Sequence, residues 1–205
     1  LGVAGMLVSA YARGAAALVV TFGLTIIGIL IWRVADGVAG AARDLSASAL
    51  VTFYPVFLAG FAALMLAAPD GRQRIVVFIL VTVFSDIGGY AVGVKFGKHP
   101  MAPSLSPKKS WEGFAGSVLS CALVGAISLP LLLDGVWWAG AVLGVVAAAA
   151  ATLGDLIESS IKRDLGIKDM STILPGHGGL MDRLDSVVVV APVAWALLLL
   201  FVPVA

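Results

Sequence analysis

The chain has 205 residues, of which 60% are hydrophobic and only 12% are charged, and its mean hydropathy is +1.07. A charged share about half that of ordinary soluble domains, combined with long apolar runs, excludes a soluble globular protein and predicts an integral membrane protein. The formal net charge of +1 gives no indication of a nucleic-acid partner, for which a basic surface is typical.

Six apolar segments are long enough to cross a bilayer as helices. They lie at about residues 15–32, 48–68, 75–94, 114–133, 136–156 and 187–204. Residues 1–12 are a candidate for a seventh, partial span. Because backbone in contact with lipid must satisfy its own hydrogen bonds, we expect an all-α helix bundle that forms one membrane domain over residues 1–205. The chain begins without a methionine, and we expect that part of its N-terminal region is missing.

The distribution of basic residues predicts the orientation of the spans. The connections 95–112 and 157–186 each contain four Lys or Arg residues, whereas the turn near Asp134 contains none. Basic connections favour the cytoplasm, so both connections should face it, together with residues 33–47, and the C-terminus should lie outside. Arg72 and Arg74 fall on the outer side and do not fit this pattern.

The third span contains a charge, Asp86, within the stretch FSDIGGYAVGVKFGK. A carboxylate at membrane depth is costly and is therefore a candidate functional residue. The alternative is a hydrogen-bonded aspartate that holds the helices together.

The stretch SPKKSWEG lies at the membrane boundary just before the fourth span and includes Lys108, Lys109 and Ser110. These residues could bind the phosphate of an anionic lipid or of a nucleotide. The alternative is a basic flank with an interfacial tryptophan, as is usual on the cytoplasmic side of a span.

Two groups of carboxylates flank the connection 157–186. In TLGDLIESSIKRD, Asp155 shares a helix face with Glu158 and Ser159. In DRLD, Asp182 and Asp185 share a face if they are helical, and carboxylates at this spacing can bind a divalent cation that also holds substrate phosphates. The two helix ends could bring Asp155, Asp182 and Asp185 together. The alternatives are a helix end reaching water for the first group and first-turn residues that complement the helix dipole for the second.

The stretch PGHGG at 175–179 contains three glycines, which allow the backbone to approach a ligand closely. Backbone amides that precede a helix suit a phosphate group. His177 could contact a phosphate or a base, although a histidine in a loop is often simply exposed.

From Ser159 to Asp185 the chain reads SSIKRDLGIKDMSTILPGHGGLMDRLD. This stretch resembles the signature of the phosphatidate cytidylyltransferases (CDP-diacylglycerol synthases), in which S-x-apolar-K-R and K-D precede P-x-H-G-G and D-R-apolar-D. The stretches SDIGGYAVGVKFGK and SPKKSWEG are similar to upstream elements of the same family. The resemblance therefore predicts that residues 85–185 form the catalytic portion.

The resemblance implies a nucleotidyltransferase of phospholipid biosynthesis that uses CTP and phosphatidic acid to make CDP-diacylglycerol and pyrophosphate. It implies Mg²⁺ as the cofactor, with a second cation as an open alternative, and a homodimer in a bacterial-type inner or plasma membrane. The active site is expected to face the cytoplasm, where CTP is supplied, and to meet the lipid substrate at the bilayer.

The resemblance also assigns roles to the candidate residues. The expected metal ligands are Asp155, Asp182 and Asp185. The expected phosphate-binding residues are Lys162, Arg163, Lys168 and Arg183. The residues expected to shape the nucleotide pocket are His177, Gly178 and Gly179. The residues expected near the triphosphate or the lipid head group are Lys108, Lys109, Ser110 and Ser159. Asp86 is expected as a polar wall residue.

Three other classes remain as alternatives. CDP-alcohol phosphotransferases carry D-G-x₂-A-R, but in DGVAGAARDLSAS the arginine, Arg43, comes two positions late and the downstream aspartates are missing. CTP-dependent kinases of polyprenol or other lipid alcohols are a second class. A transporter or channel would carry charges at the bilayer midplane and paired broken spans, and only Asp86 fits that pattern. CTP-dependent release of pyrophosphate would distinguish the cytidylyltransferase from all three.

Overall fold

The computed structural model describes residues 1–35, 37, 39–167 and 181–203, without the side chains of residues 182 and 183. The described part of the chain contains six helices that are long and apolar enough to cross a membrane. These spans are Ala15–Ala35, Ala41–Leu66, Gly71–Phe96, Trp111–Leu133, Trp137–Asp164 and Leu184–Phe201. The predicted all-α architecture with six spans is thereby confirmed, and the protein is an integral membrane protein.

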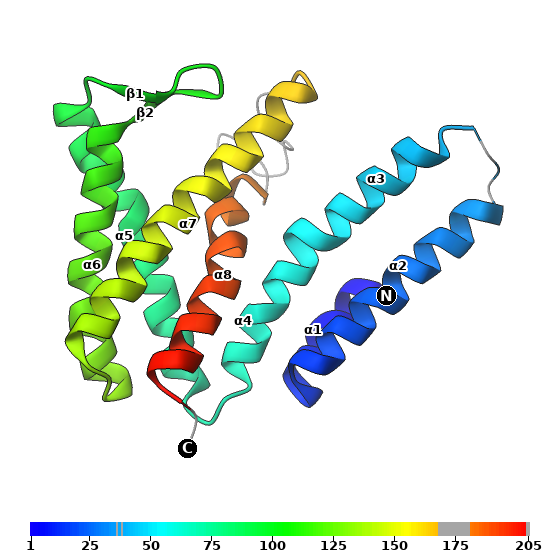
Figure 1. Ribbon diagram of the computed structural model, residues 1–205, viewed down its shortest axis with the longest axis horizontal. Coiled ribbons are helices and arrows are strands. Elements are labelled where there is room, and N and C mark those ends of the chain that lie inside the picture. Colours follow the sequence, from blue (N-terminus) through cyan, green and yellow to red (C-terminus); the bar gives the residue numbers. More distant parts are fainter. Residues whose placement is uncertain (36, 38, 168–180, 204–205) are drawn as a thin grey trace. The chain divides into compact units, whose positions relative to one another are not determined.

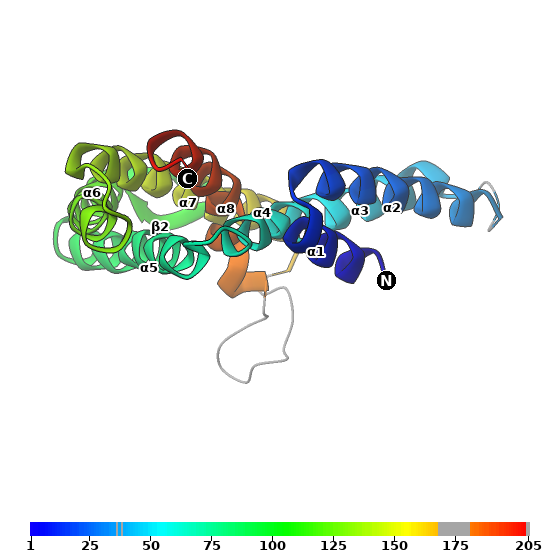
Figure 2. The ribbon, with the colours of Figure 1, turned by 90° about the horizontal axis from the view of Figure 1, so that it is seen from below.

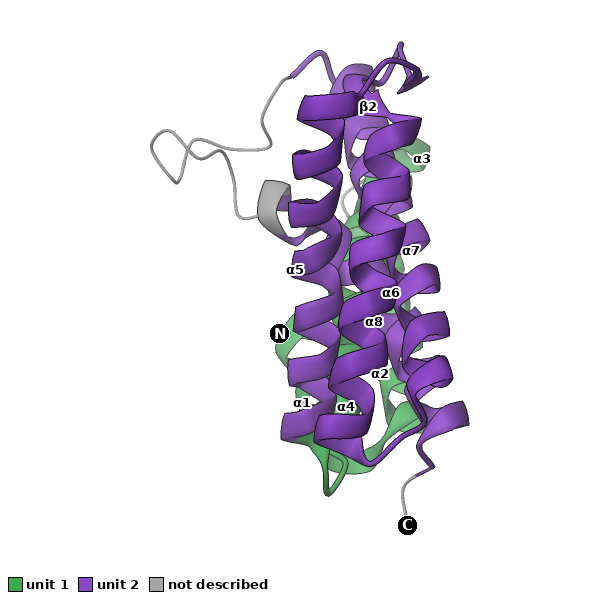
Figure 3. Ribbon diagram, turned by 90° about the vertical axis from the view of Figure 1, so that its left-hand side faces the viewer, with its two compact units in different colours: residues 1–71 green, residues 72–205 purple. Residues whose placement is uncertain are grey.

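The contacts divide the chain into two compact units, Leu1–Gly71 and Arg72–Ala205, which Figure 3 shows in different colours. Unit 1 contains α1 (Gly2–Arg13), α2 (Ala15–Ala35), α3 (Ala41–Val51), the π-helical segment η1 (Thr52–Phe57) and α4 (Leu58–Leu66). Unit 2 contains α5 (Gly71–Phe96, which begins at the boundary), β1 (Pro100–Ala102), β2 (Ser106–Ser110), α6 (Trp111–Leu133), α7 (Trp137–Asp164) and α8 (Met181–Phe201).

In unit 1, the second span is longer than the apolar run predicted. It begins at Ala41 rather than near residue 48, so most of the expected connection 33–47 is helical. The span continues through η1, where Pro55 lies inside the helix. Proline has no N–H to donate to the preceding turn, and such a turn commonly widens or bends. α1 is helical as well, but its 12 residues are too few to cross a bilayer.

In unit 2, hydroxyl groups and small residues allow the helices to pack closely. The Ser117 hydroxyl on α6 donates a hydrogen bond to the carbonyl of Ser85 on α5 at 2.6 Å. Between α6 and α7, a Cβ atom placed on Gly144 would lie 2.0 Å from the carbonyl oxygen of Cys121. Only glycine fits such a contact, and small residues of this kind are typical of helix interfaces in membranes.

Arg74 explains why the basic residues at the start of α5 did not fit the charge pattern. Its side chain is buried, and its guanidinium donates a hydrogen bond to the carbonyl of Val202, just after α8, at 2.6 Å. Arg74 therefore lies inside unit 2 and is not a residue of a solvated connection. The positive-inside rule counts basic residues in short connections, so this arginine carries little weight in it.

The described basic residues of the connections 95–112 and 157–186 include Lys108 and Lys109 in β2 and Lys162 and Arg163 at the end of α7. Figure 1 shows the β1–β2 hairpin and the C-terminal end of α7 at one end of unit 2, which we call the hairpin end, and α8 begins nearer to this end than to the other. The α6–α7 turn and the last described residues lie at the opposite end, from which Figure 2 views the four helices. The apolar pattern did not predict the hairpin, because its strands are short and rich in Pro, Lys and Ser, which rarely indicate strands.

Candidate active site

A cavity of about 230 Å³ lies between α5, α6, α7 and β2, and we call it the first cavity. Its lining includes five of the residues that the sequence singled out. They are Asp86 on α5, Lys108, Lys109 and Ser110 on β2, and Asp155 on α7. Segments separated by up to 69 positions in the sequence are therefore brought to one place.

Three carboxylates and one lysine form the charged centre of this site. The ammonium group of Lys109 pairs with the carboxylate of Asp155, and each side chain is about one quarter exposed. Asp86, Asp155 and Asp185 on α8 interact electrostatically with one another, and Lys109 acts on both Asp86 and Asp155. We call Asp86, Asp155 and Asp185 the carboxylate cluster. Asp86 and Asp155 line the first cavity, and Asp185 acts on both of them from α8.

A glycine explains how α7 and α8 bring two of these carboxylates together. A Cβ atom placed on Gly154 would lie 2.6 Å from the carbonyl oxygen of Asp185 and 3.1 Å from the Cα of Ser186. Any larger residue would force the helices apart at this level. Asp155 is next to Gly154 in the sequence, and Gly154 packs against the backbone of Asp185. This close approach of α7 and α8 brings the two aspartates to the same site.

A second cavity, of about 260 Å³, lies between the hairpin and the C-terminal end of α7. Its polar lining consists of Ser106, Lys108, Ser159, Lys162 and Arg163. Lys108 lines both cavities, so they are neighbours. The sequence predicted the end of this span near residue 156, but α7 continues to Asp164. Ser159, Lys162 and Arg163 are therefore helical residues and do not belong to a loop.

Glu158 is buried on α7, with 1% of its surface exposed, so it is not the solvated helix end that the alternative described. Its carboxylate lies 3.4 Å from the ammonium group of Lys162, one helical turn later. Sequence reasoning placed Glu158 on the face of Asp155 but did not include it among the site residues. The sequence feature that could have indicated its role is the spacing of four residues between Glu158 and Lys162, which allows an ion pair on a helix.

The chain matches the model of the cytidylyltransferase family over residues 1–201. It belongs to this family. It is 45% identical over 195 residues to the phosphatidate cytidylyltransferase of Mycobacterium leprae, an alignment that covers 87% of this chain and 62% of the relative. Its identity to the protein of the same name from Mycobacterium tuberculosis (strain H37Rv) is 42% over 200 residues, with 91% and 61% covered.

A more distant relative, the phosphatidate cytidylyltransferase of Staphylococcus saprophyticus, is 37% identical over 142 residues, with 68% of this chain and 54% of the relative covered. The chain thus spans about six tenths of the length of the mycobacterial relatives. The family that the sequence resembles is confirmed by these matches.

Several residues of the cytidylyltransferase signature lie outside the part of the chain that the structure describes. They are Lys168, Asp169, Pro175, His177, Gly178 and Gly179. Asp182 and Arg183 belong to the first turn of α8, but their side chains lie outside the described part as well. Their predicted roles stay predictions.

The described side chains suit Mg²⁺ in their chemistry, although no three His, Cys, Asp or Glu residues among them form a group that could hold a metal ion. Mg²⁺ prefers oxygen ligands and is commonly bound by one or two carboxylates together with substrate phosphates. Asp155 and Asp185 supply two such carboxylates beside a cavity, so the donor set fits the ion that the cytidylyltransferase resemblance implies.

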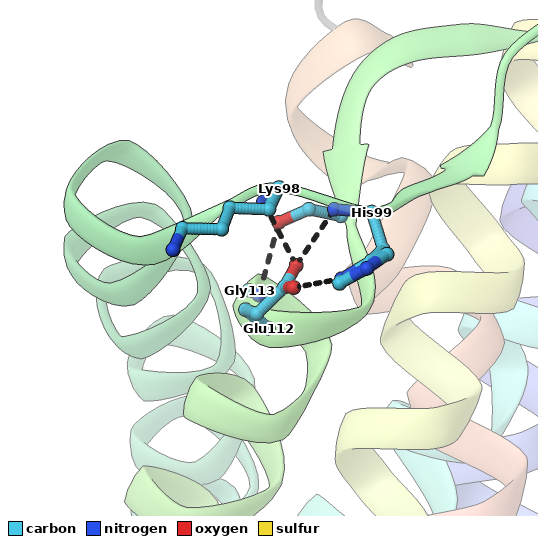
Figure 4. A network of polar contacts seen from close by, with 5 residues as sticks. Lys98, His99, Glu112 and Gly113 are labelled. Carbon is cyan, nitrogen blue, oxygen red and sulfur yellow. Dashed lines mark hydrogen bonds and ion pairs between the residues drawn. The ribbon is translucent and has the colours of Figure 1, made fainter.

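A network at the base of the hairpin was not foreseen from the sequence (Figure 4). Glu112, in the first turn of α6, accepts hydrogen bonds from the backbone N–H groups of Lys98 and His99 at 3.1 and 3.2 Å. Its second oxygen lies 2.5 Å from Nδ1 of His99. The Ser110 hydroxyl caps α6 by accepting a hydrogen bond from the N–H of Gly113 at 3.1 Å. No spacing rule connects residues 99 and 112, which is why the pattern did not reveal the network.

Proposed function

We propose that this protein transfers the cytidylyl group of CTP to phosphatidic acid, forming CDP-diacylglycerol and releasing pyrophosphate. The observation that carries the proposal is the carboxylate cluster of the first cavity beside the basic second cavity, with Lys108 shared between them. The names of the mycobacterial and staphylococcal relatives support the same substrates.

The proposed reaction is a substitution at phosphorus. A phosphate oxygen of phosphatidic acid bonds to the α-phosphorus of CTP, and the bond from that phosphorus to the oxygen bridging it to the β-phosphate breaks, so that pyrophosphate leaves with the electron pair. The attacking phosphate is already an anion, and a strong general base is not needed. The main obstacle is the repulsion between two polyanions, which positioning and charge neutralisation overcome.

The residues of the two cavities divide this work. Lys108, Lys162 and Arg163 bind phosphate groups in the second cavity, where Arg163 also donates to the carbonyl of Leu105 in the hairpin at 3.5 Å. Asp155 and Asp185 are the described residues that would hold Mg²⁺, which when bound supplies charge neutralisation at the phosphate oxygens. Asp182 as a third ligand, and a second cation, are part of the proposal on the strength of the family signature.

We further propose that the hairpin end faces the cytoplasm, where CTP is supplied. Support comes from the described basic residues at this end, which include Lys108 and Lys109 in β2 and Lys162 and Arg163 in the last turn of α7, because such residues favour the cytoplasmic side. A homodimer is proposed on the family resemblance alone, and light scattering of the detergent-purified protein would test it.

The proposed reaction is tested by measuring pyrophosphate release from the detergent-purified protein with CTP, phosphatidic acid and Mg²⁺. We expect release only when all three are present. Asp155→Asn should remove the activity, whereas Asp134→Asn, at the exposed opposite end of α6, should retain it. Release of CDP with phosphorylation of a lipid alcohol would instead indicate a CTP-dependent lipid kinase.

A further inference from the structure

We propose that Glu112 is a positioning residue, which acts by holding the β1–β2 hairpin in place over the first cavity. Its carboxylate lies at the start of α6 and does not line the cavity. It would therefore act through the residues that the hairpin carries, Lys108, Lys109 and Ser110. The activity that it supports is the proposed function above, so this inference rests on that function for its kinetic test.

The contacts of Glu112 join the two ends of the hairpin segment. One oxygen binds the backbone N–H groups of Lys98 and His99, and the other lies against the His99 ring (Figure 4). The N–H of Trp111 in turn donates to the carbonyl of His99 at 3.0 Å. The chain that enters β1 is thus bound to the chain that leaves β2. A carboxylate suits this position, because the N-terminal turn of a helix favours a negative charge.

The hairpin needs such an anchor because its own ladder is short. β1 has three residues and β2 has five, with Pro100 opposite Ser110 and Ala102 opposite Ser106. An isolated two-stranded hairpin is marginally stable at best. Hydrogen bonds that hold residues 98 and 99 also hold the start of β1. Because Pro100 pairs with Ser110, the end of β2 is held in place as well.

The end of β2 is where the charged groups of the site are located. Lys109 pairs with Asp155, Lys108 lines both cavities, and Ser110 lines the first cavity while capping α6. All three lie within four residues of Glu112. A misplacement of about 1 Å can lower a reaction rate by about 100-fold, so a loosened hairpin would lower turnover with all the reacting groups still present.

The kinetic test compares Glu112→Ala, Glu112→Gln and His99→Ala. We expect Glu112→Ala to lower kcat/KM for CTP by about 10- to 100-fold with a thermal unfolding midpoint close to that of the wild type. Glu112→Gln keeps one acceptor oxygen and should recover part of the loss. His99→Ala keeps both backbone hydrogen bonds and should have the smallest effect. Asp134→Asn is the matched control, because it neutralises an acidic group at the other end of α6, and it should leave kcat/KM unchanged.

A double-mutant cycle tests the route through Lys109. If Glu112 acts by placing this lysine, Glu112→Ala should cost little more once Lys109 has been replaced by alanine. The loss in the double variant should then be smaller than the product of the two single losses. Losses that multiply would overturn the route through Lys109.

Hydrogen–deuterium exchange of the hairpin, measured without substrates, separates this inference from the proposed function. We expect the backbone of residues 98–110 to exchange faster in Glu112→Ala than in the wild type or in Asp134→Asn. If exchange rises in this way while the wild type releases no pyrophosphate, the result supports the anchoring role of Glu112 and contradicts the proposed reaction. Equal exchange in all three proteins would overturn the anchor. If Glu112→Ala does not fold, Glu112→Gln takes its place, and wild-type exchange in that variant would overturn the anchor as well.

Discussion

At the scale of single residues, Lys109 offsets the negative charge of the aspartates at the first cavity. It pairs with Asp155 and acts on Asp86, while Asp185 adds a third negative group. Without this lysine the three carboxylates would repel one another with less compensation, and the phosphates of a substrate would meet an acidic site. The ion pair is about one quarter exposed, so water screens part of its contribution to stability.

We therefore expect Lys109→Ala to lower kcat/KM by about 100-fold or more, with a loss of stability of only about 1 kcal/mol. Lys109→Arg keeps the charge and should preserve stability, but its planar group has a different geometry, so it should recover activity only in part. The measurements are pyrophosphate-release kinetics and thermal unfolding of the three proteins. Wild-type kinetics in Lys109→Ala would show that this lysine has no role in turnover.

Single residues of the site differ in how far the sequence alone predicts their positions. Asp155 and Asp185 could be expected to meet, because each lies at the end of an apolar run and the two runs are neighbours. Asp86 could be singled out only as a charge inside a span. The contact of Glu112 with His99 and the burial of Glu158 could not be predicted, since they depend on a hairpin and on two further turns of α7 that the hydropathy pattern does not contain.

At the scale of elements, the approach of α7 to α8 decides where the carboxylates lie. Gly154 allows this approach, since even a methyl group there would overlap the backbone of Asp185. The six spans themselves are predictable from apolar runs, because the bilayer requires helices of that length. The distance between two helices cannot be predicted from apolar runs, because it depends on which small residues lie at the contact between the helices.

We expect Gly154→Val to lower the thermal unfolding midpoint and to reduce pyrophosphate release by at least about 10-fold, because it separates Asp155 from Asp185. Gly23→Ala is the control: Gly23 is also inside a helix, but a Cβ atom there meets nothing within 4 Å. This control should be neutral or slightly stabilising, by up to about 1 kcal/mol. A Gly154→Val protein as stable and active as the control would show that the close approach is not required.

At the scale of the whole molecule, the orientation in the membrane decides which solution the site meets. The proposed orientation predicts the accessibility of two exposed positions in unit 2, Ser104 in the hairpin and Val136 at the opposite end. The native Cys121 is the only cysteine of the sequence and is buried. Single cysteines introduced in a Cys121→Ser background can therefore be followed without interference.

We expect a membrane-impermeant maleimide added to intact cells to label Val136→Cys but not Ser104→Cys. Inside-out vesicles should give the reverse result, because the hairpin end should then face the reagent. The reversed pattern in both preparations would place the hairpin end outside the cell, and a cytosolic supply of CTP could not reach the proposed site.

The bond between Arg74 and the carbonyl of Val202 joins positions 128 residues apart, and this separation has a consequence for biogenesis. The ribosome delivers α5, with its arginine, to the insertion machinery well before α8 has been made. Until the last helix arrives this hydrogen bond cannot form, and the guanidinium has to rely on its other polar neighbours, because burying a charge in a membrane is costly. The hydrogen bond that joins the start of α5 to the end of α8 therefore forms only after α8 has been made, so a chain that stops short of Val202 would lack this bond.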